Sequence, residues 1–131
     1  MIRGLVHIGI TVRDFDAMLG FYTTVLGLTV DSLVPHPRGG RKACLRGSDA
    51  EVIELISYPD PKPHQGRDRS RTGIHHFGFV VDDVRAHRER LADLGVEFDG
   101  EVAPNSKGDL VQHFWDPEGN RVHLTQRGQP P

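Results

Sequence analysis

The chain has 131 residues, of which 37% are hydrophobic and 26% are charged, and its formal net charge is −2. This balance is typical of a globular protein and excludes a disordered chain. The charge provides no basic face for a nucleic acid, no apolar run is long enough to span a bilayer, and a single cysteine, Cys44, excludes an internal disulfide. We therefore expect a cytoplasmic protein that binds neither nucleic acid nor membrane.

Taken in chain order, the first part of the sequence predicts a strand, a helix and three further strands. Hydrophobic residues alternate over 3–12, which is typical of a strand. Asp14 is placed to cap the helix that follows, and Gly27 suits its C-terminal end. Strands are expected near 28–34, 41–46 and 51–58, with Cys44 as a small core residue.

The second part of the sequence repeats this order after a segment that is rich in proline and charge. Residues 59–72 are expected to be a solvated linker that contains Arg67, Arg69 and Arg71. A strand over 73–81 precedes a helix that Asp82 or Asp83 would cap. The remaining elements are strands near 96–102, 109–115 and 121–127, and the tail 127–131 should fray.

The two parts are an internal repeat. Gly, His, Gly and Asp residues recur 69 positions apart, as in His7 and His76. The sequence therefore predicts an α+β fold of two βαβββ modules, 3–58 and 73–127, joined by the linker 59–72. Neither module, at about 60 residues, is expected to be stable alone, so we expect one domain over residues 1–131.

The alternation of side chains along the strands predicts a site on the face opposite the helices. His7 and His76 lie on that face of the first strand of each module. Glu54 and His123 lie on the same face of each last strand, 47 residues further along in both cases. The repeat thus places four potential ligands at equivalent positions.

Three imidazoles and one carboxylate suit a divalent transition metal (Zn, Ni, Co, Fe or Mn) better than Mg or Ca. With six coordination positions, two would remain for a substrate with two adjacent oxygens. Two more histidines lie nearby. His75 has the opposite parity, so it should pack behind the site or orient a ligand. For His113 two positions are open: it faces the pocket, as a substrate contact or acid/base, or it points away from the pocket.

Five sequence segments carry a family pattern: 7–14 (HIGITVRD), 21–28 with its FY and LGL, 52–55 (VIEL), 73–77 (GIHHF) and 116–122 (DPEGNRV). Together they resemble the vicinal oxygen chelate superfamily, which includes glyoxalase I, methylmalonyl-CoA epimerase, extradiol dioxygenases, and fosfomycin and bleomycin resistance proteins. The resemblance covers residues 4–126.

The resemblance implies that the paired modules form an open, cup-like mixed sheet around a metal, with the helices on the outer face, in a homodimer. It implies that His7, Glu54, His76 and His123 are the metal ligands. Glyoxalases, epimerases and extradiol dioxygenases usually carry Glu where this chain has His123. We therefore expect Glu54 to be the catalytic base, with His123 as a ligand or acid partner.

Three functions are compatible with these residues. The first is a metal-dependent lyase or isomerase, glyoxalase I-like or epimerase-like, that removes a proton next to a chelated carbonyl. The second is an Fe(II)-dependent dioxygenase of a catechol-like substrate, since His7, His76 and Glu54 form a two-His-one-carboxylate set. The third is a metal-free protein that sequesters a small molecule or antibiotic.

Overall fold

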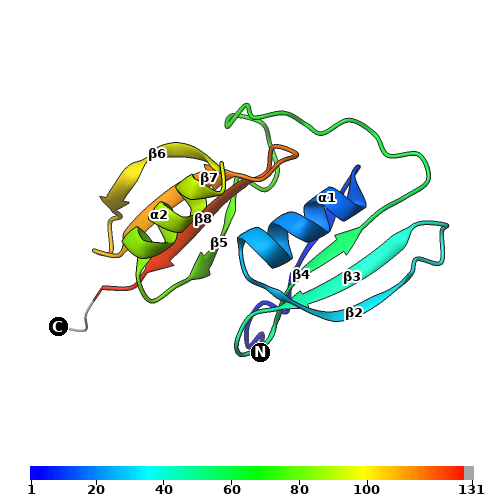
Figure 1. Cartoon of the computed structure of the whole chain (residues 1–131), viewed down its shortest axis with the longest axis horizontal. Coiled ribbons are helices and arrows are strands. Elements are labelled where there is room, and N and C mark those ends of the chain that lie inside the picture. Colours follow the sequence, from blue (N-terminus) through cyan, green and yellow to red (C-terminus); the bar gives the residue numbers. More distant parts are fainter. Residues whose placement is uncertain (129–131) are drawn as a thin grey trace. The chain divides into compact units, whose positions relative to one another are not determined.

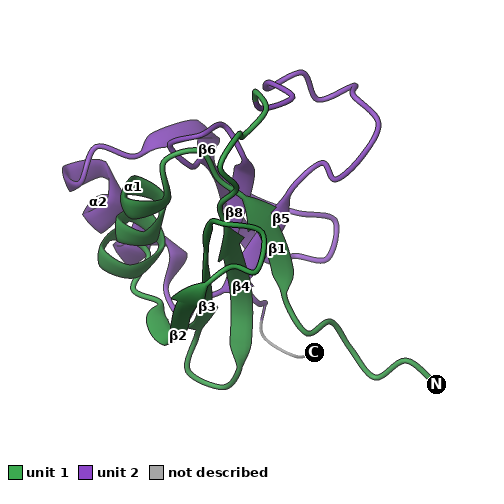
Figure 2. Ribbon diagram, turned by 90° about the vertical axis from the view of Figure 1, so that its right-hand side faces the viewer, with its two compact units in different colours: residues 1–63 green, residues 64–131 purple. Residues whose placement is uncertain are grey.

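The computed structural model describes residues 1–128 and divides the chain into two compact units, which begin at Met1 and at His64. Figure 2 shows the first unit in green and the second in purple. Residues 129–131 of the tail that was expected to fray lie outside the described residues. Within residues 1–128, no helix is long and apolar enough to cross a membrane.

The first unit contains a four-stranded sheet with the order β1-β4-β3-β2, in which β1 and β4 are parallel and the other pairs are antiparallel. The helix packs against β4 of this sheet (Figure 1). The elements are β1 (Ile8–Thr11), α1 (Phe15–Gly20), the π-helical turn η1 (Phe21–Val25), β2 (Thr29–Pro35), β3 (Arg41–Arg46) and β4 (Glu51–Ile56).

Local chemistry explains where the first helix begins and ends. The carboxylate of Asp14 accepts a hydrogen bond from the backbone N–H of Ala17 at 3.1 Å, which satisfies one of the free donors of the first turn. Phe15 and Met18 then bury their side chains against the sheet. After η1, the chain leaves the helix at Gly27, whose φ of +83° favours glycine.

The second unit has the same plan, with the sheet order β5-β8-β7-β6 and a parallel pair between β5 and β8. Of the two expected caps, Asp83 is the one whose carboxylate accepts from the backbone N–H of Ala86. The elements are β5 (Phe77–Val80), α2 (Val84–Asp93), β6 (Glu97–Pro104), β7 (Leu110–Trp115) and β8 (Arg121–Gln126).

A tight turn joins β7 to β8 and is built around a buried carboxylate. Asp116 is 1% exposed, and its side chain accepts hydrogen bonds from the backbone N–H groups of Glu118 and Asn120. Gly119 supplies the positive φ, +96°, that the turn requires. This turn fixes the register of β8, the strand that carries His123.

The predicted α+β class with two βαβββ modules is confirmed. The first strand of each module is shorter than expected. β1 begins at Ile8, opposite Ile53 of β4, so residues 3–7 precede the strand, and Val6 is 70% exposed. In the second unit β5 begins at Phe77, opposite Val122, so residues 73–76 precede the strand.

Residues 62–72 of the expected linker are all exposed, which agrees with a solvated segment. Two of its arginines also form surface ion pairs with the second sheet. Arg67 forms an ion pair with Glu97 on β6 and lies 4.5 Å from the centroid of the Trp115 ring. Arg69 forms an ion pair with Asp99, also on β6. The alternation of charges in this segment therefore serves to attach it to the second sheet.

Candidate functional site

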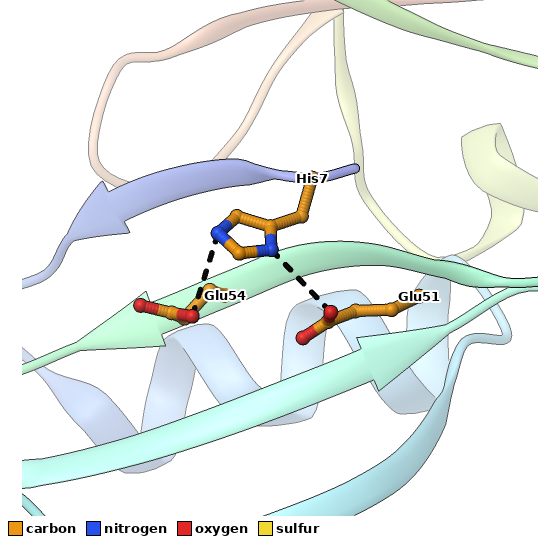
Figure 3. A group of neighbouring side chains, drawn as sticks. All are labelled: His7, Glu51 and Glu54. Carbon is orange, nitrogen blue, oxygen red and sulfur yellow. Dashed lines mark hydrogen bonds and ion pairs between the residues drawn. The ribbon is translucent and has the colours of Figure 1, made fainter. Parts of the chain in front are cut away.

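In the first unit, one imidazole lies between two carboxylates. His7 immediately precedes β1, and its Nε2 is 3.4 Å from Oε2 of Glu54 on β4. Its Nδ1 is hydrogen-bonded to Oε2 of Glu51 at the start of β4, also at 3.4 Å (Figure 3). One ligand atom from each of the three residues lies within 4.8 Å of the other two, so the group could hold a metal ion. We call these residues the first-module cluster.

The strand register explains why Glu54 reaches this position. Glu54 pairs with Gly9 on β1 and with Cys44 on β3, and its side chain is 16% exposed. The neighbouring residues Ile53 and Leu55 are fully buried in the core on the opposite face. The parity predicted for Glu54 therefore agrees with the structure, and the predicted approach of His7 to Glu54 is present within the unit.

Glu51 was missed because a regular strand would point it toward the core, together with Ile53. A register shift between β3 and β4 changes this. Leu45 pairs with Ile53, whereas the next residue, Arg46, pairs with Glu51, so β4 carries one extra residue in between. The bulge turns Glu51 toward His7. An ExxE spacing at the start of a strand is the only sequence signal, and a bulge cannot be read from it.

Cys44 also belongs beside this cluster. It is half-buried, not the core residue we expected. A hydrogen bond between the thiol and Glu51 raises the pKa of Cys44, and the same contact is the largest cause that lowers the pKa of Glu51, followed by the hydrogen bond from His7. Lys42 adds a positive charge, with its Nζ 4.0 Å from Oε2 of Glu54. The two carboxylates are thus surrounded by donors.

In the second unit, three imidazoles gather on one face of the sheet. His113 on β7 pairs directly with His123 on β8, and their ring centroids are 5.2 Å apart. The ring of His76, just before β5, lies 5.1 Å from that of His123 and 5.7 Å from that of His113. We call these residues the second-module cluster. His113 thus faces the same side as the two predicted ligands.

Desolvation and neighbouring positive charges lower the pKa of all three imidazoles, which favours their neutral form. Desolvation is the largest cause that lowers the pKa of His113, to about 4, and Arg121 and His123 add to it. Desolvation followed by the charge of His76 lowers the pKa of His123. The pKa of His76 is also lowered, by desolvation and then by His75. Since a metal binds the neutral ring, these shifts favour coordination over a surface role.

His75 does not pack behind the sheet, which was one of its two expected positions. It is exposed, and its Nδ1 lies 2.8 Å from Nδ1 of His76. This contact agrees with the other expectation, that His75 orients a ligand. The structure therefore groups the predicted residues within each unit: His7 with Glu54, and His76 with His123 and His113.

Comparisons with known proteins agree with this fold. The model of the glyoxalase/bleomycin resistance protein/dioxygenase superfamily matches residues 4–124. An ethylmalonyl-CoA/methylmalonyl-CoA epimerase from Cereibacter sphaeroides is 29% identical, over 96% of this chain and 99% of the relative. The uncharacterised protein YaeR of Escherichia coli is 31% identical, over 92% of this chain and 94% of its own.

Solved structures also share this fold. The protein SMU.1112c superposes with a TM-score of 0.84 at 28% identity, over 95% of this chain and 99% of its own. A glyoxalase I variant from Zea mays gives a TM-score of 0.75 at 25% identity, and the match covers 96% of this chain and 45% of the maize chain.

Proposed function

Because the chain belongs to the glyoxalase/bleomycin resistance protein/dioxygenase superfamily, the vicinal oxygen chelate proteins, we propose that it is a metal-dependent lyase or isomerase. It would remove a proton next to a carbonyl group of a small substrate with two adjacent oxygens. Similarity to an epimerase along nearly the whole of both chains supports this reaction class. The two units would form one domain, and the protein would act in the cytoplasm as a homodimer.

The ligands of the metal in this proposal are His7, Glu54, His76 and His123. The observation that carries it is the matching register of the two sheets: Glu54 lies opposite Gly9, and His123 lies opposite the equivalent Gly78. Each module thus presents an imidazole before its first strand and a second ligand on its last strand. Three nitrogens and one oxygen suit Zn, Ni, Co, Fe or Mn.

Glu54 is the base in this proposal. A divalent ion held by these residues would polarise the carbonyl oxygen of the substrate and make the neighbouring C–H more acidic. Oε2 of Glu54 would accept that proton and return it to carbon. Nζ of Lys42 lies 4.0 Å from this oxygen and places a positive charge beside the carboxylate. Nε2 of His7 lies 3.4 Å from it, close enough for both residues to bind the same ion. Since the pKa of His123 is lowered, the neutral ring suits a ligand better than an acid.

The test begins with removal of all metal from the protein. Each of the five metals is then added back separately, and turnover is measured. Hemithioacetal isomerisation and acyl-CoA epimerisation are assayed, the latter also by exchange of the α-proton with D₂O. We expect activity with at least one metal and a loss of at least about 100-fold in Glu54→Gln, as is typical for removal of a general base. Glu101→Gln, whose side chain is 87% exposed on the second unit, is the matched control and should retain activity.

Other results would favour the rival functions. Iron-dependent oxygen uptake with a catechol, without proton exchange, would replace the proposal with a dioxygenase. Absence of turnover with every metal, together with ligand binding that is unaffected by a His7→Ala/His76→Ala double substitution, would replace it with a sequestering protein.

A further inference from the structure

The two carboxylates beside His7 lie on different ring nitrogens. Glu51 approaches Nδ1 and Glu54 approaches Nε2, both at 3.4 Å, from opposite edges of the imidazole (Figure 3). A neutral imidazole carries one N–H donor and one lone pair. A metal can bind only the nitrogen with the lone pair, so the proton must lie on the other one. The two carboxylates therefore have different roles toward a metal bound by His7.

The repeat decides which nitrogen faces the metal. Glu54, on the Nε2 side, occupies the register position that His123 occupies in the second sheet. Glu51 corresponds by the offset of the repeat to Asn120, whose side chain instead forms a hydrogen bond with His64 at 3.0 Å. The Nε2 side is thus common to both modules, whereas the Glu51 side is particular to the first.

The histidines of the second unit have the same arrangement. Nδ1 of His123 is 2.7 Å from the hydroxyl oxygen of Thr125, and Nδ1 of His76 is 2.8 Å from Nδ1 of His75. In all three histidines among the proposed ligands, Nδ1 therefore meets a polar neighbour from its own unit. Glu51 is the anionic one among these neighbours, and an ionised carboxylate can only accept a hydrogen bond.

We propose that Glu51 is a positioning residue for metal binding: it accepts the Nδ1–H of His7 and so keeps the Nε2 lone pair directed toward the metal, beside Glu54. This role rests on the metal site of the proposed function. Such carboxylate–histidine–metal arrangements fix the tautomer and ring orientation, and their loss typically weakens metal affinity by about 10- to 100-fold. The extra residue in β4 is what brings Glu51 into reach.

The tautomer of His7 in the metal-free protein tests this role without any need for activity. Two-dimensional ¹⁵N NMR at neutral pH should show the proton on Nδ1 in the wild type. Glu51→Leu should move the proton to Nε2, and Glu51→Gln, whose amide oxygen can still accept, should largely keep it on Nδ1. Asp49→Asn removes an exposed carboxylate two residues earlier and is the matched control, with no expected change.

Zinc titration of the same four proteins gives the second readout. Affinity should fall by about 10- to 100-fold in Glu51→Leu, by less in Glu51→Gln, and not at all in Asp49→Asn. A proton on Nε2 in the wild type, or an unchanged tautomer in Glu51→Leu, would overturn the proposal. Equal affinity losses in both Glu51 variants with an unchanged tautomer would instead make Glu51 a direct ligand. Failure of the wild type to bind any metal would reject the proposed function itself, whatever the tautomer.

Discussion

The imidazole of His123 lies directly over the backbone of Gly78. A Cβ atom added to Gly78 would lie 2.3 Å from Cε1 and 2.4 Å from Nε2 of that ring, far closer than atoms can approach. The two residues are register partners in the parallel pair of β5 and β8. The glycine therefore serves the site, because the ring of a candidate ligand occupies the space where a side chain would otherwise lie.

Substitution of Gly78 by alanine should displace His123. We expect a loss of metal affinity of at least about tenfold and a destabilisation of about 1–3 kcal/mol, as for overpacking. The matched control is Gly9→Ala at the equivalent position of the first sheet. A Cβ atom added there would have no neighbouring atom within 4 Å. Zinc titration and urea unfolding of both variants check this, and similar behaviour of the two would contradict it.

The lowered pKa of His113 should make stability depend on pH. Above its ordinary value of 6.5, the ring is neutral in both the folded and the unfolded chain. As the pH falls from 6.5 toward about 4, the unfolded chain gains a proton that the folded one does not, so stability is lost over this window. His113→Gln should reduce this loss. Urea unfolding midpoints at pH 7.5, 5.5 and 4.5 measure the loss of stability in the wild type and in His113→Gln. The same pH dependence in both proteins would argue against a lowered pKa of His113.

The ion pairs of Asp99 predict that its substitution lowers the stability of the protein. Arg121, whose side chain is 9% exposed, donates from Nε to Asp99 at 2.8 Å, and Arg69 reaches the same carboxylate. Asp99→Asn should destabilise the protein by about 1–3 kcal/mol, because it leaves a largely buried guanidinium without its charged partner.

The control for this substitution is Asp60→Asn. Asp60 pairs with Lys62 where both side chains are more than 80% exposed, so the loss should be within about 0.5 kcal/mol. Chemical denaturation compares the two variants, and equal stabilities would show that the Asp99 pair contributes little.

The fold could be predicted from sequence because the repeat carries the same signals twice. Helix caps, stop glycines and alternating strands recur at a constant offset, and each pattern confirms its counterpart. The parity of Glu54 followed from the fully buried neighbours Ile53 and Leu55. The lengths of β1 and β5 did not follow, because they depend on where pairing with β4 and β8 begins, which alternation alone does not report.

Glu51 and Cys44 are the parts of the site that the sequence did not reveal. Parity assigns Glu51 to the core face, and only a bulge in β4 reverses it. Cys44 looked like a small apolar residue, and its contact with Glu51 depends on that same bulge. The side on which His113 lies depends on its direct pairing with His123, which the sequence alone does not report.

Calorimetric titration of the metal-free full chain with Zn²⁺ and Ni²⁺ tests the central claim most directly. The account predicts one bound ion per chain and a large loss of affinity on substitution of either His7 or His123 by alanine, since one residue from each module would serve the same ion. Absence of binding, or binding that the His123→Ala substitution leaves unchanged, would contradict it.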